Sequence, residues 1–176
     1  KLNDELMALF IKQYLEGGFS DKIYAKKEID SIRYLDRYIQ LRPVCHWEGV
    51  RNVQCPYNGQ MDWTIHPNLK EAQEFIAFRE WSTLDQNTLK LISRDTVNIS
   101  FEGKSSQATK LVLGVKGLNS LLLKVDSGAK NLIVYYIVEE IEGKYVSCIL
   151  SHWDNDRVQP NGLPALLGEV MSLEKK

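Results

Sequence analysis

The segment from Ser151 to Asp156 holds the densest set of side chains that could do chemistry, with a hydroxyl, an imidazole and two carboxylates. Ser151 and His152 are adjacent, and adjacent residues on a strand point to opposite faces, so they cannot form the hydrogen bond of a serine triad. Asp154 and Asp156 match the first and third positions of a calcium loop. Three later positions do not match, namely Val158, Gln159 and Ala165. The segment is therefore typical of a strand end that caps a turn, with a weak cation site at the two aspartates as the alternative.

A second candidate cluster combines the carboxylate of Asp62 with the imidazole of His66. Carboxylates and imidazoles are the usual general acids and bases of enzymes. Convergence of these two residues with His152 and Asp154 on one pocket would favour a small enzyme of the isomerase, dehydratase or hydrolase type. His66 also precedes Pro67, so a role in capping a following helix explains it as well. The four residues are candidates, and no catalytic residue is assigned from the sequence.

Aromatic side chains gather in segments with irregular composition. These residues are Trp47, Tyr57, Trp63 and Trp153. Exposed aromatic residues in loops often contact a flat or apolar partner, which predicts a ligand-binding role. The alternative is that they close the hydrophobic core of a small domain.

The chain has three cysteines, at Cys45, Cys55 and Cys148. An odd number argues against a framework built only of disulfides. Cys45 and Cys55 are close enough in sequence to pair, and a bridge over so short a loop is worth about 2–3 kcal/mol. Three free and mostly buried thiols are the alternative. No CxxC pair, standard zinc spacing or glycine-rich phosphate motif occurs, so we expect neither a metal nor a cofactor.

Composition narrows the class of protein. A length of 176 residues fits one domain, and 44% hydrophobic with 26% charged residues is ordinary for a globular chain. The 22 basic and 23 acidic residues nearly cancel, which argues against a broad nucleic-acid surface. No apolar run approaches the ~18 residues that a membrane helix needs, so no membrane span is expected.

The N-terminal half has helical spacing. Apolar residues at intervals of three and four predict helices over 4–16 and 24–40. Asn68 followed by Glu71 resembles a capping pair and predicts a third helix over 68–81.

The remainder of the chain has the composition of strands and turns. Asn58-Gly59 predicts a hairpin tip. Further strands are expected at 96–101, 109–116, 120–126, 130–142 and 145–153. Together they predict an antiparallel meander over 96–153, followed by a short helix over 163–173. The strand 130–142 is apolar on both faces, which indicates a central strand covered on two sides.

This order of elements is similar to that of the NTF2-like and cystatin-like architectures. The resemblance rests on element order alone, from the helices over 4–16 and 24–40 to the meander. It implies one α+β domain over 1–176, in which N-terminal helices pack on a curved antiparallel sheet and leave a cone-shaped pocket. Such folds host enzymes, binding modules and passive partners alike, so no activity follows from the resemblance.

The lack of a convergent catalytic set favours a non-enzymatic binding or interaction module. It would hold a small apolar ligand or a protein partner in the sheet concavity or at the Trp-bearing loops. The alternatives are the pocket enzyme described above and an accessory or inhibitor-type subunit of a larger assembly. Because strand 130–142 needs cover on both faces, a homodimer through the sheet is also open. The start at Lys1 and the loop cysteines favour an exported protein, either periplasmic or secreted.

Overall fold

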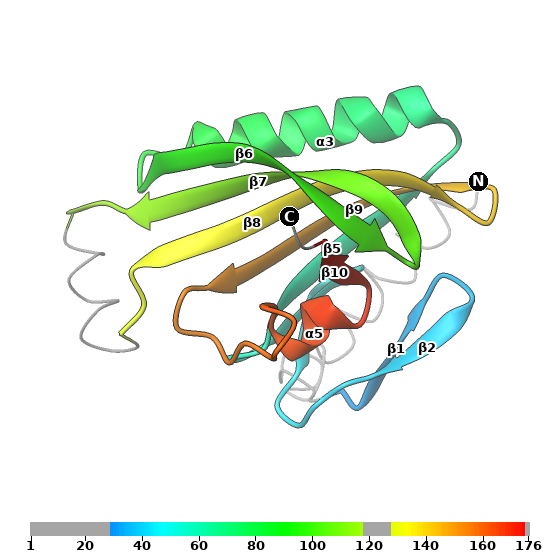
Figure 1. The fold of residues 1–176 in the computed structure, drawn as a ribbon, viewed down its shortest axis with the longest axis horizontal. Coiled ribbons are helices and arrows are strands. Elements are labelled where there is room, and N and C mark those ends of the chain that lie inside the picture. Colours follow the sequence, from blue (N-terminus) through cyan, green and yellow to red (C-terminus); the bar gives the residue numbers. More distant parts are fainter. Residues whose placement is uncertain (1–28, 118–127, 175–176) are drawn as a thin grey trace, which may run out of the picture.

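The computed structural model describes residues 29–117 and 128–174 of the chain. In this part of the chain, an eight-stranded antiparallel sheet dominates, and a two-stranded hairpin lies beside it (Figure 1). The strands are β1 (Ser31–Tyr34), β2 (Arg37–Gln40), β3 (His46–Gly49), β4 (Asn52–Cys55), β5 (Gly59–His66), β6 (Leu89–Phe101), β7 (Lys104–Val115), β8 (Asn131–Ile141), β9 (Lys144–Trp153) and β10 (Met171–Leu173). The order across the large sheet is β10-β6-β7-β8-β9-β5-β4-β3.

Helix α3 (Leu69–Leu84) runs along one face of this sheet (Figure 1). It begins where the sequence predicts, because the Asn68 side chain accepts a hydrogen bond from the Glu71 backbone N–H at 2.9 Å. The Asn68 amide also donates to the Glu71 carboxylate at 2.9 Å, which completes a reciprocal cap. The helix contacts β5, β6, β8 and β9.

The helix expected over 24–40 is wrong, since residues 31–40 form the antiparallel hairpin β1–β2. Ile32 lies opposite Ile39, and both are buried. The chain reverses at Leu35, whose φ of 51° is the left-handed conformation of a turn. The helix expected over 4–16 lies outside the described residues. The predicted architecture of N-terminal helices packed on a sheet, with its NTF2-like or cystatin-like order, is therefore wrong. In the described residues the sheet dominates, and the long helix α3 follows five strands.

The C-terminal helix expected over 163–173 is also largely wrong. Helix α5 spans only Ala165–Gly168, and the chain then forms β10, which pairs with β6 at the edge of the sheet. The apolar residues of this segment are buried in the larger core. They are Leu163, Leu166, Leu167, Val170 and Met171.

Strands β6 to β9 form an antiparallel meander, as the sequence predicts, although β6 begins at Leu89 and the strand expected over 120–126 lies outside the described residues. The central strand β8 contributes to two cores. Val134 and Tyr136 pack on the face that α3 covers, and Tyr135 and Ile137 pack in the larger core on the opposite face. Both faces of β8 are thus covered within one chain, which removes the reason for expecting a homodimer through the sheet.

The larger core lies between the sheet, α5 and the β1–β2 hairpin (Figure 1). It contains a disulfide between Cys45 and Cys55, so the pairing that the sequence left open is present. Cys148 is a buried free thiol in the same core. Of the helices in the described ranges, none has the length and apolar character to cross a lipid bilayer.

Candidate functional site

Along β5, successive side chains point to opposite faces of the sheet, so its polar and apolar residues lie on different faces. Met61 and Trp63 are buried in the larger core, whereas Gln60 and Asp62 face the side on which α3 lies. The register places Gln60 opposite Ser151 on β9. At β5, this face of the sheet therefore presents polar groups beside the apolar cluster that α3 covers on β7 and β8.

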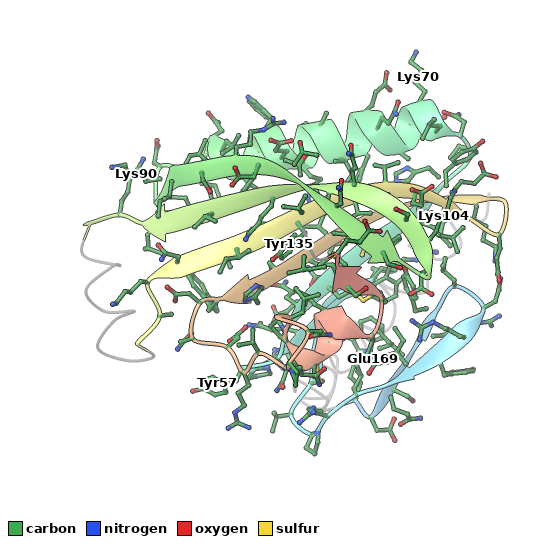
Figure 2. All side chains as sticks on the ribbon, viewed as in Figure 1. Tyr57, Lys70, Lys90, Lys104, Tyr135 and Glu169 are labelled. Atoms are coloured by element: carbon green, nitrogen blue, oxygen red, sulfur yellow. A yellow bond between two sulfur atoms is a disulfide. The ribbon has the colours of Figure 1, made fainter. Side chains whose placement is uncertain are left out.

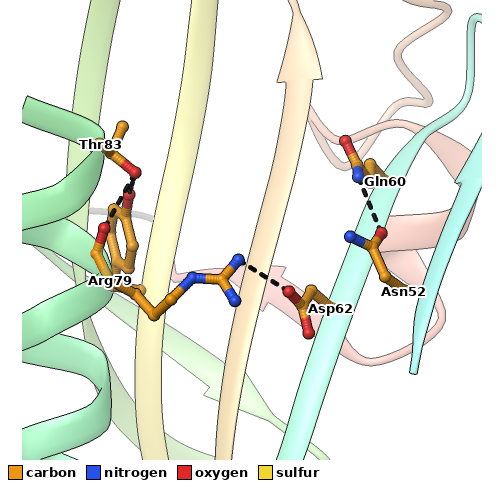
Figure 3. Close-up of polar contacts among 6 residues, drawn as sticks. Asn52, Gln60, Asp62, Arg79 and Thr83 are labelled. Atoms are coloured by element: carbon orange, nitrogen blue, oxygen red, sulfur yellow. Dashed lines mark hydrogen bonds and ion pairs between the residues drawn. The ribbon is translucent and has the colours of Figure 1, made fainter. Parts of the chain in front are cut away.

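Helix α3 adds polar side chains to the same space, and one of them reaches across the sheet (Figure 3). The Arg79 guanidinium extends over β8 and β9 and pairs with the Asp62 carboxylate on β5, with Nη2 and Oδ2 2.8 Å apart. One turn later, the Thr83 hydroxyl accepts a hydrogen bond from the Tyr136 hydroxyl at 2.7 Å. The same Thr83 hydroxyl donates to the Arg79 backbone carbonyl at 3.0 Å.

Two hollows lie along this face. The one next to the helix has a volume of about 150 Å³, and eight of its twelve lining residues are polar. The second, of about 200 Å³, continues toward the β4–β5 turn. Both are lined by Gln60, Leu132 and Ser151, so the two hollows adjoin each other. We call the two together the polar groove, with a helix end at Arg79 and a tyrosine end at Tyr57. Its hydrogen-bonding lining residues include Asn52, Gln54, Gln60, Asp62, Arg79, Thr83, Gln86, Tyr136 and Ser151.

At the helix end of the polar groove, the charges of Asp62 and Arg79 neutralise each other. Asp62 and Arg79 retain only 17% and 39% of their side-chain exposure, and partial burial strengthens a charged hydrogen bond. The Arg79 guanidinium also stacks over the Phe75 ring at 5.7 Å, which restricts its rotamers. Between β4 and β5, the Gln60 amide donates to the Asn52 carbonyl at 2.8 Å (Figure 3). These contacts tie together polar side chains from α3, β4 and β5 at the helix end of the groove.

At the tyrosine end, the Asn58-Gly59 turn joins β4 to β5, as the sequence predicts. Gly59 has a φ of 95°, and a Cβ there would lie 2.4 Å from Leu167 Cδ1, so only glycine fits. Tyr57 has a φ of 61°, an unusual conformation for a bulky residue, and its side chain is 54% exposed (Figure 2). The Arg157 guanidinium lies 5.8 Å from its ring.

The four acid–base candidates do not converge. Asp62 lies in the polar groove, but His66 lies at the far end of β5, where its ring bonds to the Ser147 hydroxyl at 2.7 Å. His152 is buried, stacks on Tyr135 and borders the tyrosine end of the polar groove, but the strand register places its side chain on the face of the sheet opposite Asp62. The Asp154 carboxylate accepts bonds from the Lys130 backbone N–H and the Asn131 amide, as a strand end that caps a loop would.

The candidate cation-site and aromatic residues also lie in different parts of the structure. Asp156 is buried and accepts a hydrogen bond from the Trp153 backbone N–H at 3.1 Å. Within the two described ranges, no three His, Cys, Asp or Glu residues are grouped so that they could hold a metal ion. Trp63 belongs to the larger core, and Trp47 is 41% exposed and packs on it. Tyr57 and Trp153, in contrast, line the polar groove.

Sequence reasoning did not find the amides of the polar groove or Arg79. The signal in the sequence is the alternation along β5, in which every second residue from Gln60 to His66 is polar. Comparison with protein families, curated proteins and solved structures gives no match. The assignment of the site therefore rests on its geometry.

Burial of His152 gives the protein a pH-dependent stability. Burial lowers the pKa of this imidazole, although the nearby Asp156 and Asp154 carboxylates oppose the shift. Because its pKa in the folded state lies below the value of about 6.5 in the unfolded chain, the unfolded state binds the proton more readily. We therefore expect the free energy of unfolding to fall as the pH is lowered through about 6.5 toward 5.5. Urea denaturation at several pH values in this window measures the effect.

The matched control is His152→Gln, which removes the titrating ring. His66 has a pKa lowered by burial as well, so a smaller pH dependence should remain in this variant. Burial raises the pKa of Asp156, and a raised carboxyl pKa favours folding on acidification, which opposes the effect of the histidines. An identical pH slope in the wild-type protein and in His152→Gln would contradict the assignment.

Proposed function

We propose that the protein is a non-enzymatic binding module that holds a small polar ligand in the polar groove. The observation that carries this proposal is the polar lining of the hollow between α3 and strands β4, β5 and β9, next to the apolar cluster that α3 covers. A helix normally packs its apolar side on a sheet, yet here Arg79 and Thr83 meet Asn52, Gln60 and Asp62. Buried polar groups are costly unless they are satisfied, and a preformed hollow lined by them is the usual form of a small-molecule site.

The lining supports a polar ligand in place of the apolar one expected from the tryptophans. Eight of the twelve residues that line the helix end are polar, and four are apolar. A binding role is also better supported than catalysis, because Asp62 is held by Arg79 and lies on the opposite face of the sheet from His152.

The disulfide supports a location outside the reducing cytoplasm. Cys45 and Cys55 are bonded in the larger core, and such bridges persist mainly in exported proteins. We therefore extend the proposal to a protein that works in an oxidising compartment.

The test is a thermal-shift screen with a panel of small polar molecules and two charge-pair variants. A ligand present at about 100 times its Kd should stabilise the folded protein by about 2.7 kcal/mol. We expect the shift to disappear in Asp62→Asn/Arg79→Gln, which removes both charges of the helix end while keeping polar side chains at the two positions. It should persist in Lys70→Ala/Glu74→Ala, which removes an exposed ion pair from the same helix. Lys70 points away from the sheet (Figure 2).

Two results would overturn the proposal. One is a ligand-induced shift that survives in Asp62→Asn/Arg79→Gln, because the ligand would then bind elsewhere. The other is the absence of any shift across the panel for a protein that unfolds cooperatively.

A further inference from the structure

The polar groove is unusually rich in carboxamide side chains. Asn52, Gln54, Gln60 and Gln86 all line it. Each amide carries both a donor and an acceptor, as does a hydroxyl group. Within the described residues, the bond from Gln60 Nε2 to Asn52 Oδ1 leaves Asn52 Nδ2 as a donor and Gln60 Oε1 as an acceptor for a ligand. A ligand with several neighbouring hydroxyls matches this lining.

The charge of the groove disfavours ions. Asp62 and Arg79 are the charged residues that line its helix end in the described structure, and they neutralise each other at 2.8 Å. An anion there would approach the Asp62 carboxylate, and a cation would approach the Arg79 guanidinium. At the tyrosine end, Asp156 is 9% exposed and is already bonded to the Trp153 backbone. His152, which also lines this end, is buried, and burial lowers its pKa and favours the neutral ring. The lining therefore suits a neutral ligand.

The tyrosine end adds an aromatic surface. Tyr57 and Trp153 both line this part of the groove, and the Tyr57 ring is exposed. A non-glycine residue with a positive φ persists only where its surroundings enforce it, and such residues often lie at binding sites. The C–H face of a sugar ring is apolar and packs on aromatic rings. The hydroxyls at the edge of the sugar ring form hydrogen bonds with amides and carboxylates.

Together, these features define the ligand class. We infer that the polar groove binds a neutral oligosaccharide, whose hydroxyls bond to the amides and to Asp62 while one ring packs on Tyr57. This inference rests on the proposed function. Along β5, the distance from Asp62 to Gly59 is three residues, or about 10 Å, which exceeds a single sugar ring. We therefore expect at least two sugar units to be bound.

The test is isothermal titration calorimetry of the full chain with defined probes. The neutral probes are maltotriose, cellotriose, xylotriose, mannotriose and N,N′,N″-triacetylchitotriose. The charged probes are trigalacturonic acid, chitosan trimer and inorganic phosphate. At least one neutral trisaccharide should bind more tightly than every charged probe.

Variants locate the bound sugar. Tyr57→Ala should weaken binding about tenfold or more, and Tyr57→Phe should keep it within about threefold, because the ring rather than the hydroxyl provides the surface. Gln60→Ala should also weaken it about tenfold or more. The control is Tyr38→Ala, which removes an exposed aromatic ring of β2, 70% exposed, and should leave the affinity unchanged.

Several outcomes overturn the inference. Tighter binding of a charged probe, or equal affinity in Tyr57→Ala and wild type, contradicts a neutral sugar on an aromatic surface. No binding of any trisaccharide to the folded protein does so as well. The proposed function is judged separately: a ligand of another class whose shift is lost in Asp62→Asn/Arg79→Gln would keep the groove as a binding site.

Discussion

Replacing Trp63 with alanine should lower the free energy of unfolding by about 3–5 kcal/mol, the usual cost of removing a buried large aromatic side chain. Trp63 is 4% exposed and lies at the centre of the larger core. Its ring meets the Tyr34 ring edge-on, with centroids 5.6 Å apart, and Cys148 lies opposite it on β9. Truncation would leave a cavity between the sheet and the β1–β2 hairpin. Urea denaturation followed by circular dichroism measures the loss.

Trp47 provides a matched control for this prediction. It is the same residue type, packs on Trp63 at 6.2 Å, and is 41% exposed, so Trp47→Ala should cost less than about 1.5 kcal/mol. If Trp63→Ala does not fold, Trp63→Phe keeps an aromatic ring in the core and should give an intermediate loss. Equal losses in Trp47→Ala and Trp63→Ala would contradict the placement of Trp63 as a core residue.

The second large effect concerns the disulfide. Cys45→Ser/Cys55→Ser should lower the free energy of unfolding by about 3 kcal/mol, because the bridge removes the freedom of a short loop from the unfolded chain. The loss should appear as a lower midpoint in thermal or urea denaturation. Since Cys55 also borders the polar groove next to Tyr57, the double variant should bind the ligand of the groove more weakly than wild type.

Reduction provides an independent route to the same result. Dithiothreitol should lower the stability of the wild-type protein toward that of Cys45→Ser/Cys55→Ser and should leave the double variant unchanged. The remaining thiol, Cys148, is completely buried, and burial raises its pKa, so it does not react readily. Wild-type stability that is insensitive to the reductant would show that the bridge does not form in solution.

Local signals predicted those elements whose determinants are close in sequence. Asn68 and Glu71 define the start of α3 through a cap three residues long. Asn58 and Gly59 identified the tip of the β4–β5 hairpin, where only a glycine fits against Leu167. The two-sided apolar pattern over 130–142 identified β8 as a central strand. Each of these features depends on backbone conformation or periodicity within a few residues.

The error over 24–40 shows where such signals fail. The seven-residue interval between Ile32 and Ile39 places both on one face of a helix, but it also places them opposite each other across a two-residue turn. Asp36, which interrupts the helical stripe, is part of that turn. In the hairpin, Tyr34 packs against Trp63, and no local pattern shows this contact between residues distant in sequence.

The sequence by itself determined a capped helix, a glycine hairpin, a central apolar strand and two cysteines able to pair, but its α+β prediction with N-terminal helices was wrong. Only the tertiary structure decided which face each polar residue occupies. Asp62 and His152 are both candidate acid–base residues, yet the strand register places their side chains on opposite faces of one sheet. Arg79 meets Asp62 because α3 folds back along that sheet. Such contacts follow from long-range packing, whose energy depends on residues that no local pattern connects.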